Sequence, residues 1–184
     1  MRNIVAAEFL SLDGVMEAPN EWHSHYVNDE MAAAQAAQLA EWDTILLGRR
    51  TYEEFVAVWP DRTSAEFGPF ADFMNNTPKV VVSKALASAS WHNSTVLRDK
   101  IAAGLVELKQ RPGKTIVVIG SASLVRFLLR EGLIDQLQLI LDPILVGAGK
   151  RLFDGAGHRT PLKLVDSRAF GTGSLVLTYE PAAG

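Results

Sequence analysis

The sequence contains no cysteine, and this absence excludes several kinds of structure and chemistry. No disulfide bond can form, no thiolate can bind zinc, and no cysteine nucleophile is available. Long apolar runs are also missing, since none approaches the ~20 residues that a membrane-spanning helix needs. Near the N-terminus there is one basic residue, and Glu8 interrupts the apolar run. We therefore expect no membrane span, no signal peptide and a cytoplasmic protein.

An excess of positive charge is absent as well. The 184 residues include 18 Lys and Arg against 21 Asp and Glu, which gives a net charge of −3. General nucleic-acid binders usually present a basic stripe, so this balance argues against that class. Apolar residues make up 48% and charged residues 21%, which are ordinary values for a globular protein. The length fits one domain over residues 1–184.

Strands that alternate with helices predict the fold class. Strands are expected over residues 3–10, 44–47, 79–83, 93–97, 115–119 and 136–141. Helices are expected over residues 29–42, 51–58, 99–110 and 121–131, with a helical turn at 70–74 and a loop at 17–25. Residues 162–170 and 174–179 alternate in polarity around a Gly-Thr-Gly turn, which is typical of a hairpin. The pattern predicts a three-layer α/β/α fold with a mostly parallel central sheet and an antiparallel C-terminal hairpin.

The strongest local pattern is a buried strand that ends at a glycine and continues into a helix. Gly48 ends one such strand, and Arg49, Arg50 and Thr51 follow it. A helix N-terminus presents free backbone N–H groups, and arginine is well shaped to bind phosphate. The design recurs after residues 115–119, at Gly120, Ser121, Ala122, Ser123 and Leu124. Capped helices explain each junction alone, but two junctions together indicate one extended ligand with several phosphates.

Other polar residues follow the ends of predicted strands. Asp13 comes directly after the first strand, at the sheet edge where ligands normally bind, although Asp-Gly pairs also form plain turns. Ser83 and Lys84 follow the third strand, where they could meet a ribose or its phosphate or could simply end the strand. His23 and His25 are two residues apart, but no third metal ligand lies near them in the sequence. We therefore predict no metal site.

Taken together and in this order, the motifs resemble the dihydrofolate reductase fold family. The closer similarity is to the branch related to the C-terminal reductase domain of the bifunctional riboflavin-biosynthesis deaminase-reductase. Residues 11–14 resemble the first-strand motif of that branch, and residues 47–52 resemble its Gly-Arg-x-Thr cofactor motif. Residues 82–84 resemble the strand end that meets the adenosine 2′-phosphate, and residues 119–122 the pyrophosphate turn. A lysine usually precedes the first-strand motif in this branch, and here Ala7 or Glu8 takes its place.

The resemblance implies an NADPH-dependent oxidoreductase that transfers hydride to a small heterocycle or imine, similar to the phosphoribosylamino-uracil reductase of riboflavin biosynthesis. It implies that Gly48 to Thr51 and Gly120 to Leu124 hold the cofactor phosphates, and that Ser83 and Lys84 meet its adenosine side. Asp13, Glu17 and Trp22 would border the nicotinamide and the substrate. We expect Asp13 to orient the substrate or to deliver a proton.

Two alternatives stay open. One is a reductase of the same fold that acts on folate, a pterin or another small molecule. The other, from a different class, is a nucleotide-binding module without catalysis. In all three cases we expect a small-molecule ligand, no nucleic acid and no membrane. The resemblance also implies a homodimer, and an apolar hairpin at the edge of the predicted sheet is well suited to form its contact.

Overall fold

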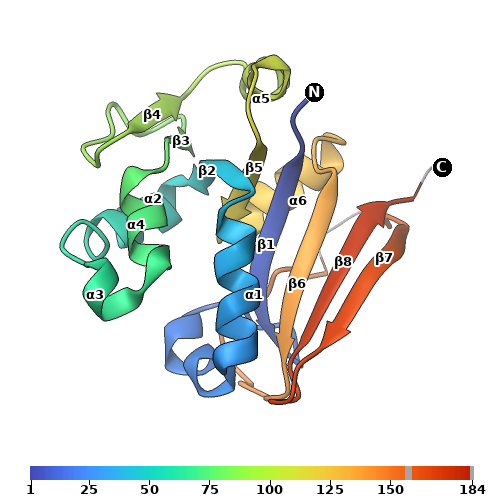
Figure 1. Cartoon of the computed structure of the whole chain (residues 1–184). Coiled ribbons are helices and arrows are strands. Elements are labelled where there is room, and N and C mark those ends of the chain that lie inside the picture. The colour runs from blue at the N-terminus through green and yellow to red at the C-terminus, as the bar shows by residue number, and fades with distance from the viewer. Residues whose placement is uncertain (156–158, 183–184) are drawn as a thin grey trace.

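An eight-stranded sheet runs through the chain, whose computed structural model describes residues 1–155 and 159–182 (Figure 1). The strand order is β4-β3-β2-β5-β1-β6-β8-β7. The strand bounds are β1 (Ile4–Ser11), β2 (Trp42–Gly48), β3 (Lys79–Val82), β4 (Ser94–Leu97), β5 (Thr115–Ile119), β6 (Gln136–Asp142), β7 (Leu162–Ala169) and β8 (Leu175–Pro181). The first six strands pair in parallel, whereas β8 is antiparallel to both β6 and β7. The predicted mostly parallel sheet with a C-terminal hairpin is confirmed.

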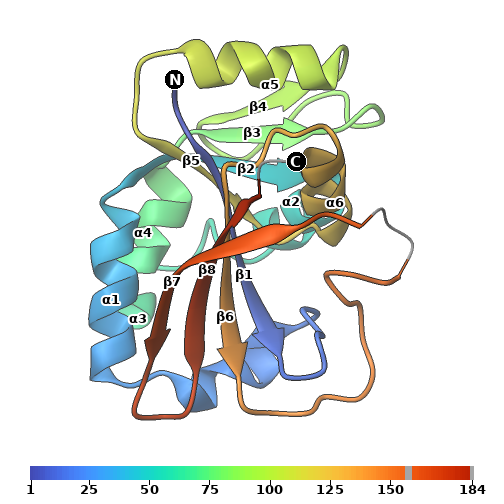
Figure 2. The same cartoon turned by 90° about the vertical axis from the view of Figure 1, so that its right-hand side faces the viewer.

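Helices cover both faces of this sheet (Figure 2). Their bounds are α1 (Asp29–Leu39), α2 (Arg49–Val56), α3 (Ser64–Phe67), α4 (Pro69–Asn76), α5 (Ile101–Gln110) and α6 (Ala122–Arg130). On one face, Leu105 of α5 and Leu128 of α6 pack in a buried cluster with alternate residues of the central strands. On the other face, Tyr52 of α2 and Met74 of α4 pack with the intervening strand residues. Strands buried on both faces explain the continuous apolar runs in the sequence.

Several element boundaries differ from those that the sequence predicts. The helix predicted over residues 29–42 ends at Leu39, because Trp42 belongs to β2 and packs its ring against Phe73, at 5.9 Å between centroids. The next helix begins two residues earlier than predicted, at Arg49. Residues 61–78 contain α3 and α4 rather than one helical turn. The predicted loop at 17–25 contains 3-10 helices at Pro19–Glu21 and His23–Tyr26.

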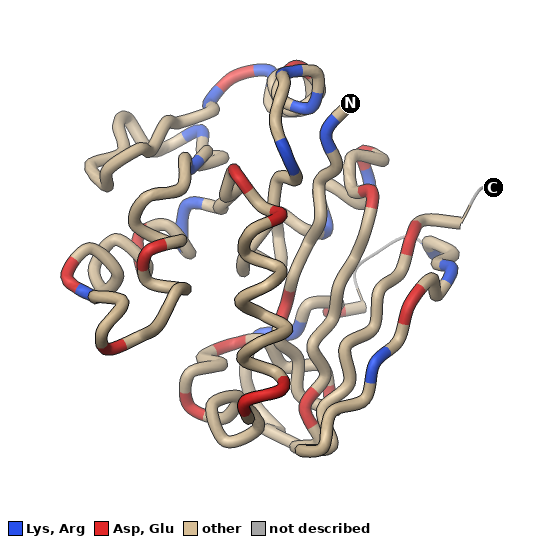
Figure 3. The backbone as a smooth tube through the Cα atoms, viewed as in Figure 1, with Lys and Arg blue, Asp and Glu red and all other residues tan. Residues whose placement is uncertain are grey.

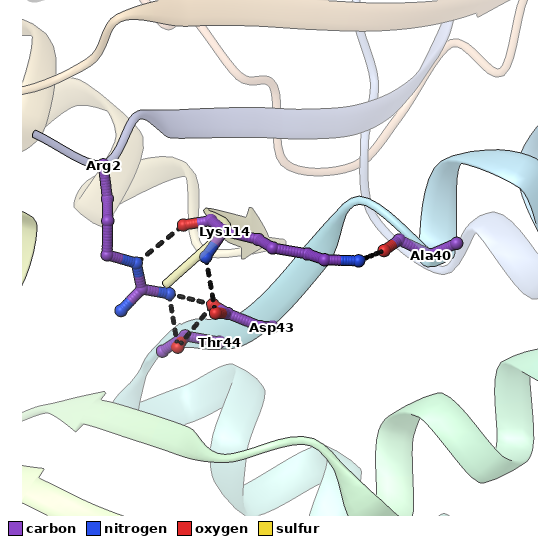
Figure 4. A network of polar contacts seen from close by, with 5 residues as sticks. All are labelled: Arg2, Ala40, Asp43, Thr44 and Lys114. Atoms are coloured by element: carbon purple, nitrogen blue, oxygen red, sulfur yellow. Dashed lines mark hydrogen bonds and ion pairs between the residues drawn. The ribbon is translucent and has the colours of Figure 1, made fainter. Parts of the chain in front are cut away.

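A polar network joins the amino ends of β1, β2 and β5 (Figure 4). Arg2 forms an ion pair with Asp43 and donates to Thr44 Oγ1 at 2.8 Å and to the Lys114 carbonyl at 2.6 Å. The backbone N–H of Lys114 donates to Asp43 Oδ2 at 2.6 Å, and its Nζ donates to the Ala40 carbonyl. Since Arg2 is buried, its own bonds are at least partly shielded from water, and together with the exposed bonds of Lys114 they fix the three strands relative to one another. Their carboxyl ends, at the opposite edge, are thereby placed in a defined register.

Charged residues of both signs occur along the whole backbone, and the middle turns of α1 contain none (Figure 3). This distribution matches the near balance of charges in the sequence. Within residues 1–155 and 159–182, none of the helices has the length and apolar character that crossing a bilayer requires.

Candidate active site

A cavity of about 1590 Å³ opens at the carboxyl ends of the parallel strands. Its wall includes Phe9 of β1, Gly48 of β2, Val82 of β3 and Ile119 of β5. Side chains from α1, α2, α6 and the 3-10 helix His23–Tyr26 complete the wall. Open parallel sheets bind ligands at this edge. The volume exceeds the ~300–1,000 Å³ of a typical small-molecule pocket, so it has room for a large ligand or for two ligands.

The two strand–glycine–helix junctions meet in this cavity and interlock. The N–H of Gly48 donates to Ser121 Oγ at 2.9 Å, and the hydroxyls of Ser121 and Thr51 share a hydrogen bond of 2.7 Å. A Cβ on Gly48 would lie 2.2 Å from Ser121 Oγ, and a Cβ on Gly120 would lie 2.9 Å from Thr51 Cγ2. A Cβ atom essentially never lies this close to another heavy atom, so a side chain at either position would force Ser121 or Thr51 to shift. The two junctions that the sequence singled out therefore lie in direct contact, and the use of both by one ligand stays a prediction.

Both junctions leave backbone donors available to an anion. Neither α2 nor α6 has a side-chain N-cap hydrogen bond, since the Ser121 hydroxyl is used between the junctions instead. Arg50 lines the cavity and has no ion-pair partner within residues 1–155 and 159–182. Arg49 pairs with Glu53 at 2.9 Å on the surface, where such a pair is weak. Two uncapped helix starts beside two arginines fit the phosphates of a dinucleotide.

The predicted adenosine contacts lie just beyond the cavity. Ser83 is buried, and its Oγ accepts the N–H groups of Ala85 and Leu86 at 3.2 and 2.9 Å, so it stabilises a turn. Lys84 is exposed and lines a smaller hollow of about 350 Å³ together with Lys100. This hollow shares Ile101 and Phe127 with the main cavity, so the two spaces adjoin. Lys100 is a cation that sequence analysis missed.

The three predicted catalytic residues have different surroundings. Asp13 is not among the residues of the cavity wall: it accepts from Ser11 Oγ at 2.6 Å and from the N–H groups of Val146 and Gly147 at 3.1 and 2.9 Å. These hydrogen bonds lower the pKa of Asp13 to about 2, and the bond from the Ser11 hydroxyl has the largest effect. The Asp13 carboxylate therefore holds the loop after β6 in place through these hydrogen bonds, and it stays ionised at neutral pH. A role of Asp13 in orienting substrate or delivering a proton stays a prediction.

Glu17 lines the cavity, and Trp22 forms a hydrogen bond to the backbone of Glu17. Glu17 forms an ion pair with Lys150 Nζ at 2.8 Å and accepts the Lys150 N–H at 3.1 Å. The hydrogen bond with the Lys150 side chain lowers the pKa of Glu17. Trp22 is buried and donates its indole N–H to the Glu17 carbonyl at 3.1 Å. The contacts of Glu17 with Lys150 and Trp22 fix one rim of the cavity. The lowered pKa means that Glu17 is ionised there at neutral pH.

A buried histidine on the cavity wall is held by a carboxylate and a serine. His23 Nδ1 lies 2.7 Å from Asp142 Oδ2, and Asp142 Oδ1 accepts the Ser174 hydroxyl at 2.6 Å. Asp142 and Ser174 are fully buried, and the His23 ring stacks on Phe9 at 3.9 Å. A carboxylate can only accept, so these partners assign a proton to Nδ1 of His23. Nε2 then remains for proton exchange, near the Gln35 amide, which also lines the cavity.

Glu8 is another side chain of the cavity wall that the sequence did not single out as a site residue. It lies in the middle of β1, only 3% exposed, and it belongs to the cavity wall. Oε2 accepts the Gly120 N–H at 3.0 Å, whereas Oε1 has no hydrogen-bond partner. Burial raises the pKa of Glu8 to about 8, and the Gly120 N–H offsets only part of this rise. At neutral pH the side chain is therefore mostly an uncharged carboxylic acid.

Of His23 and Glu8, only Glu8 had a signal that could be read from the sequence. A single acidic residue inside an otherwise apolar strand predicts a buried carboxyl group, and Glu8 stands in that position. The His23 site is assembled from Asp142 and Ser174, which lie more than a hundred residues further along the chain. No spacing rule connects such residues. The described residues contain no cluster of His, Asp and Glu suited to a metal ion.

Residues 2–176 match the family described as the RibD C-terminal domain. The chain belongs to this family. A relative in the curated proteins is YyaP, an uncharacterized protein of Bacillus subtilis (strain 168), which is 27% identical over 179 residues, 97% of this chain and 94% of YyaP. The RibD C-terminal domain family contains reductase domains, so the coarse assignment is a reductase-like domain.

Solved structures show the same RibD-type fold. A protein named for riboflavin biosynthesis from Shewanella sp. PV-4 has a TM-score of 0.78 at 20% identity, covering 100% of both chains. The diaminohydroxyphosphoribosylaminopyrimidine deaminase/5-amino-6-(5-phosphoribosylamino)uracil reductase of Thermotoga maritima has a TM-score of 0.68 at 15% identity, covering 98% of this chain and 57% of that one. At these identities the likeness establishes the fold.

Proposed function

We propose that the protein is an NADPH-dependent reductase of a small heterocycle or imine. The observation that carries this proposal is the pair of interlocked glycine junctions at one end of a cavity that has a histidine–carboxylate pair at its wall. NADPH, when bound, supplies a hydride. Arg49, Arg50 and the first N–H groups of α2 and α6 would bind its phosphates. An aminopyrimidine ribosyl phosphate is the substrate class that the name of the Thermotoga maritima structure favours.

His23 would provide the proton that accompanies the hydride. Reduction of a C=N bond adds a hydride to carbon and a proton to nitrogen. Asp142 holds Nδ1 of His23 at 2.7 Å, so the ring is oriented, and in its doubly protonated imidazolium form Nε2–H can donate that proton on the cavity side and leave a neutral ring with its proton on Nδ1. The Phe9 ring under His23 excludes water from one of its faces. A non-catalytic nucleotide-binding module has no use for an oriented acid at this place.

Cofactor choice tests the proposal. Arg50 at the cavity and Lys84 with Lys100 in the adjoining hollow put positive charge where a 2′-phosphate could lie. We expect NADPH to bind at least ~10-fold tighter than NADH, a difference of about 1.4 kcal/mol. Titration calorimetry at moderate salt measures both dissociation constants. Arg49→Ala should weaken NADPH binding much more than it changes the melting temperature of the free protein. Equal constants for NADPH and NADH would refute the cofactor assignment.

We also propose a homodimer built on the C-terminal hairpin. β7 is the edge strand of the sheet, and Leu164 and Val165 on it are 49% and 40% exposed. Leu175 of β8 adds a further exposed apolar side chain, and an exposed edge of this kind favours pairing with another chain. Each active site would then be formed mainly by one subunit, since the cavity lies on the other side of β6 from β7.

Light scattering at micromolar concentration should give about twice the chain mass of 20.1 kDa. Leu164→Glu combined with Val165→Glu should reduce the mass to that of one chain, because the charges oppose burial. Val106→Glu is the control, since Val106 is also exposed but lies on α5. A monomeric mass that persists to high concentration, or a contact made only by residues 61–78, would rule out this dimer.

A further inference from the structure

Glu8 has a position that packing alone does not explain. Ala6 and Leu10, its neighbours on the same face of β1, belong to the buried cluster under α5 and α6. An apolar side chain would continue this cluster, whereas a buried carboxyl group needs hydrogen-bond partners. The Gly120 N–H satisfies Oε2 at 3.0 Å, but Oε1 is buried without a partner. Glu8 lines the cavity but Oε1 itself is covered, so a bound molecule can complete its hydrogen bonding when the carboxyl group turns Oε1 toward the cavity.

The charged groups around the cavity do not pair with Glu8. On α6, Arg126 pairs with Asp154 at 2.7 Å and also donates to the Leu152 carbonyl. In the loops after β1 and β6, Glu17 pairs with Lys150, and Arg151 with Asp13. On α2, Arg49 pairs with Glu53, and Arg50 and Glu54 are exposed. The adjacent residues on β6 and at the β5 turn, Leu139 and Gly120, carry no charge. The Glu8 carboxyl group thus stands apart from these ion pairs.

The partner of Glu8, Gly120, belongs to the turn that is proposed to hold phosphate. Ser121 next to it bonds to Gly48 and Thr51 of the other junction. An ionised Glu8 would repel an anion at this turn, whereas a neutral carboxylic acid can donate a hydrogen bond to an anionic oxygen. Because Oε2 already accepts from Gly120, the proton belongs on Oε1, the oxygen without a partner.

We propose that Glu8 is a ligand-binding residue of the cavity that works as an uncharged acid, with Oε1 donating its proton in a hydrogen bond to an oxygen of the bound dinucleotide beside Gly120. The inference rests on the proposed function, because it takes NADPH as the ligand. It has a thermodynamic consequence: if only the protonated form binds, every molecule in which Glu8 is ionised must take up a proton when NADPH binds.

The sign of the effect follows from the pKa of Glu8, which burial raises to about 8. Well below pH 8 the carboxyl group already holds its proton, so NADPH binding should take up none at this site. At pH 8 about half the molecules are ionised, and binding should take up ~0.5 proton. Above pH 8 the affinity should fall by up to ~10-fold for each pH unit.

Calorimetric titration with NADPH in buffers of different ionisation enthalpy measures this uptake. We expect ~0.5 proton per NADPH at pH 8 and close to none at pH 6 in the wild type, beyond any uptake by NADPH itself. Glu8→Gln keeps the shape and removes the titrating proton, so its extra uptake at pH 8 should vanish and its affinity should no longer fall above pH 8. Glu54→Gln is the matched control, since it removes an exposed carboxylate of the same cavity wall and should retain the uptake.

Each outcome decides between the two proposals. If the wild type binds NADPH but Glu8→Gln shows the same proton uptake, the role of Glu8 is refuted and the proposed function stands. If folded wild-type protein gives no saturable heat with NADPH, both are refuted.

Glu8→Gln should melt no lower than the wild type at pH 8, because about half of the wild-type molecules then carry a buried charge. If Glu8→Gln does not fold, Glu8→Met should keep the packing and lose both uptake and affinity. A Glu8→Met protein that retains the affinity at pH 6 would also overturn the inference.

Discussion

Replacing Gly48 by alanine should weaken NADPH binding by ~100-fold or more, which is about 2.7 kcal/mol. The added Cβ would lie 2.2 Å from Ser121 Oγ and 2.9 Å from Ser121 Cβ, so the two junctions cannot keep their present distance. Moving them apart breaks the hydrogen bond from the Gly48 N–H to Ser121 and displaces the first turns of α2 and α6 together. Overpacking of this kind also costs about 1–3 kcal/mol of folding stability. Calorimetry gives the dissociation constant, and thermal melting gives the stability.

A second substitution separates the clash from other effects of alanine. Ser121 has a φ of 66°, a conformation that glycine adopts readily, so Ser121→Gly removes both clashing atoms without new backbone strain. The double variant Gly48→Ala with Ser121→Gly should regain much of the binding that Gly48→Ala loses. Gly171→Ala is the control, because its Cβ would meet no atom closer than 3.9 Å and it lies in the C-terminal hairpin. If Gly48→Ala binds NADPH as well as the wild type, the glycine junctions are not the phosphate site.

Replacing His23 by asparagine should lower turnover by ~100-fold or more while NADPH binding stays within about twofold. The substitution removes the acid that faces the cavity, but it leaves both glycine junctions intact. Asp142→Asn should have a similar effect on turnover, because an amide no longer fixes the proton on Nδ1 of His23. The rate of NADPH oxidation with an acceptor found by screening pyrimidines and pterins measures both variants.

His25 supplies the matched control for this prediction. It lies two residues from His23 on the same 3-10 helix, is exposed, and is not part of the cavity wall. His25→Asn should therefore leave turnover unchanged. The split between kcat and KM adds a readout that a merely structural role of His23 would not produce, because kcat should fall in His23→Asn while KM stays close to that of the wild type. Normal turnover in His23→Asn would return proton delivery to Asp13 or to solvent.

The fold was accessible from the sequence because its signals are local. Continuous apolar strands, the glycine that ends β2 and the alternation around Gly171 to Gly173 each report on neighbouring residues only. The ends of elements were less accessible, as Trp42 shows: its place in β2 depends on packing against Phe73, a residue of another helix. Local propensity extends α1 through Trp42, and tertiary packing ends it at Leu39.

In the candidate site too, the local motifs could be predicted from the sequence and the contacts between distant residues could not. The two glycine junctions were readable because each is a contiguous motif, although their mutual contact through Ser121 was not. Asp13 and His23 show the limit of this approach. Asp13 stands in a recognisable motif, yet in the structure its carboxylate binds the Val146 and Gly147 amides and lies outside the cavity wall. His23 stands in no motif, and only the folded chain brings Asp142 to its ring.

The most direct test of the central claim, that NADPH binds across the two glycine junctions, is a crystal structure of the protein saturated with NADPH. We expect the pyrophosphate to lie against the first N–H groups of α2 and α6, between Arg50 and Ser121, and the nicotinamide to lie in the cavity that Phe9 and His23 line. A cofactor bound elsewhere, or bound here with its nicotinamide outside the cavity, would contradict the assignment of this site as the centre of hydride transfer.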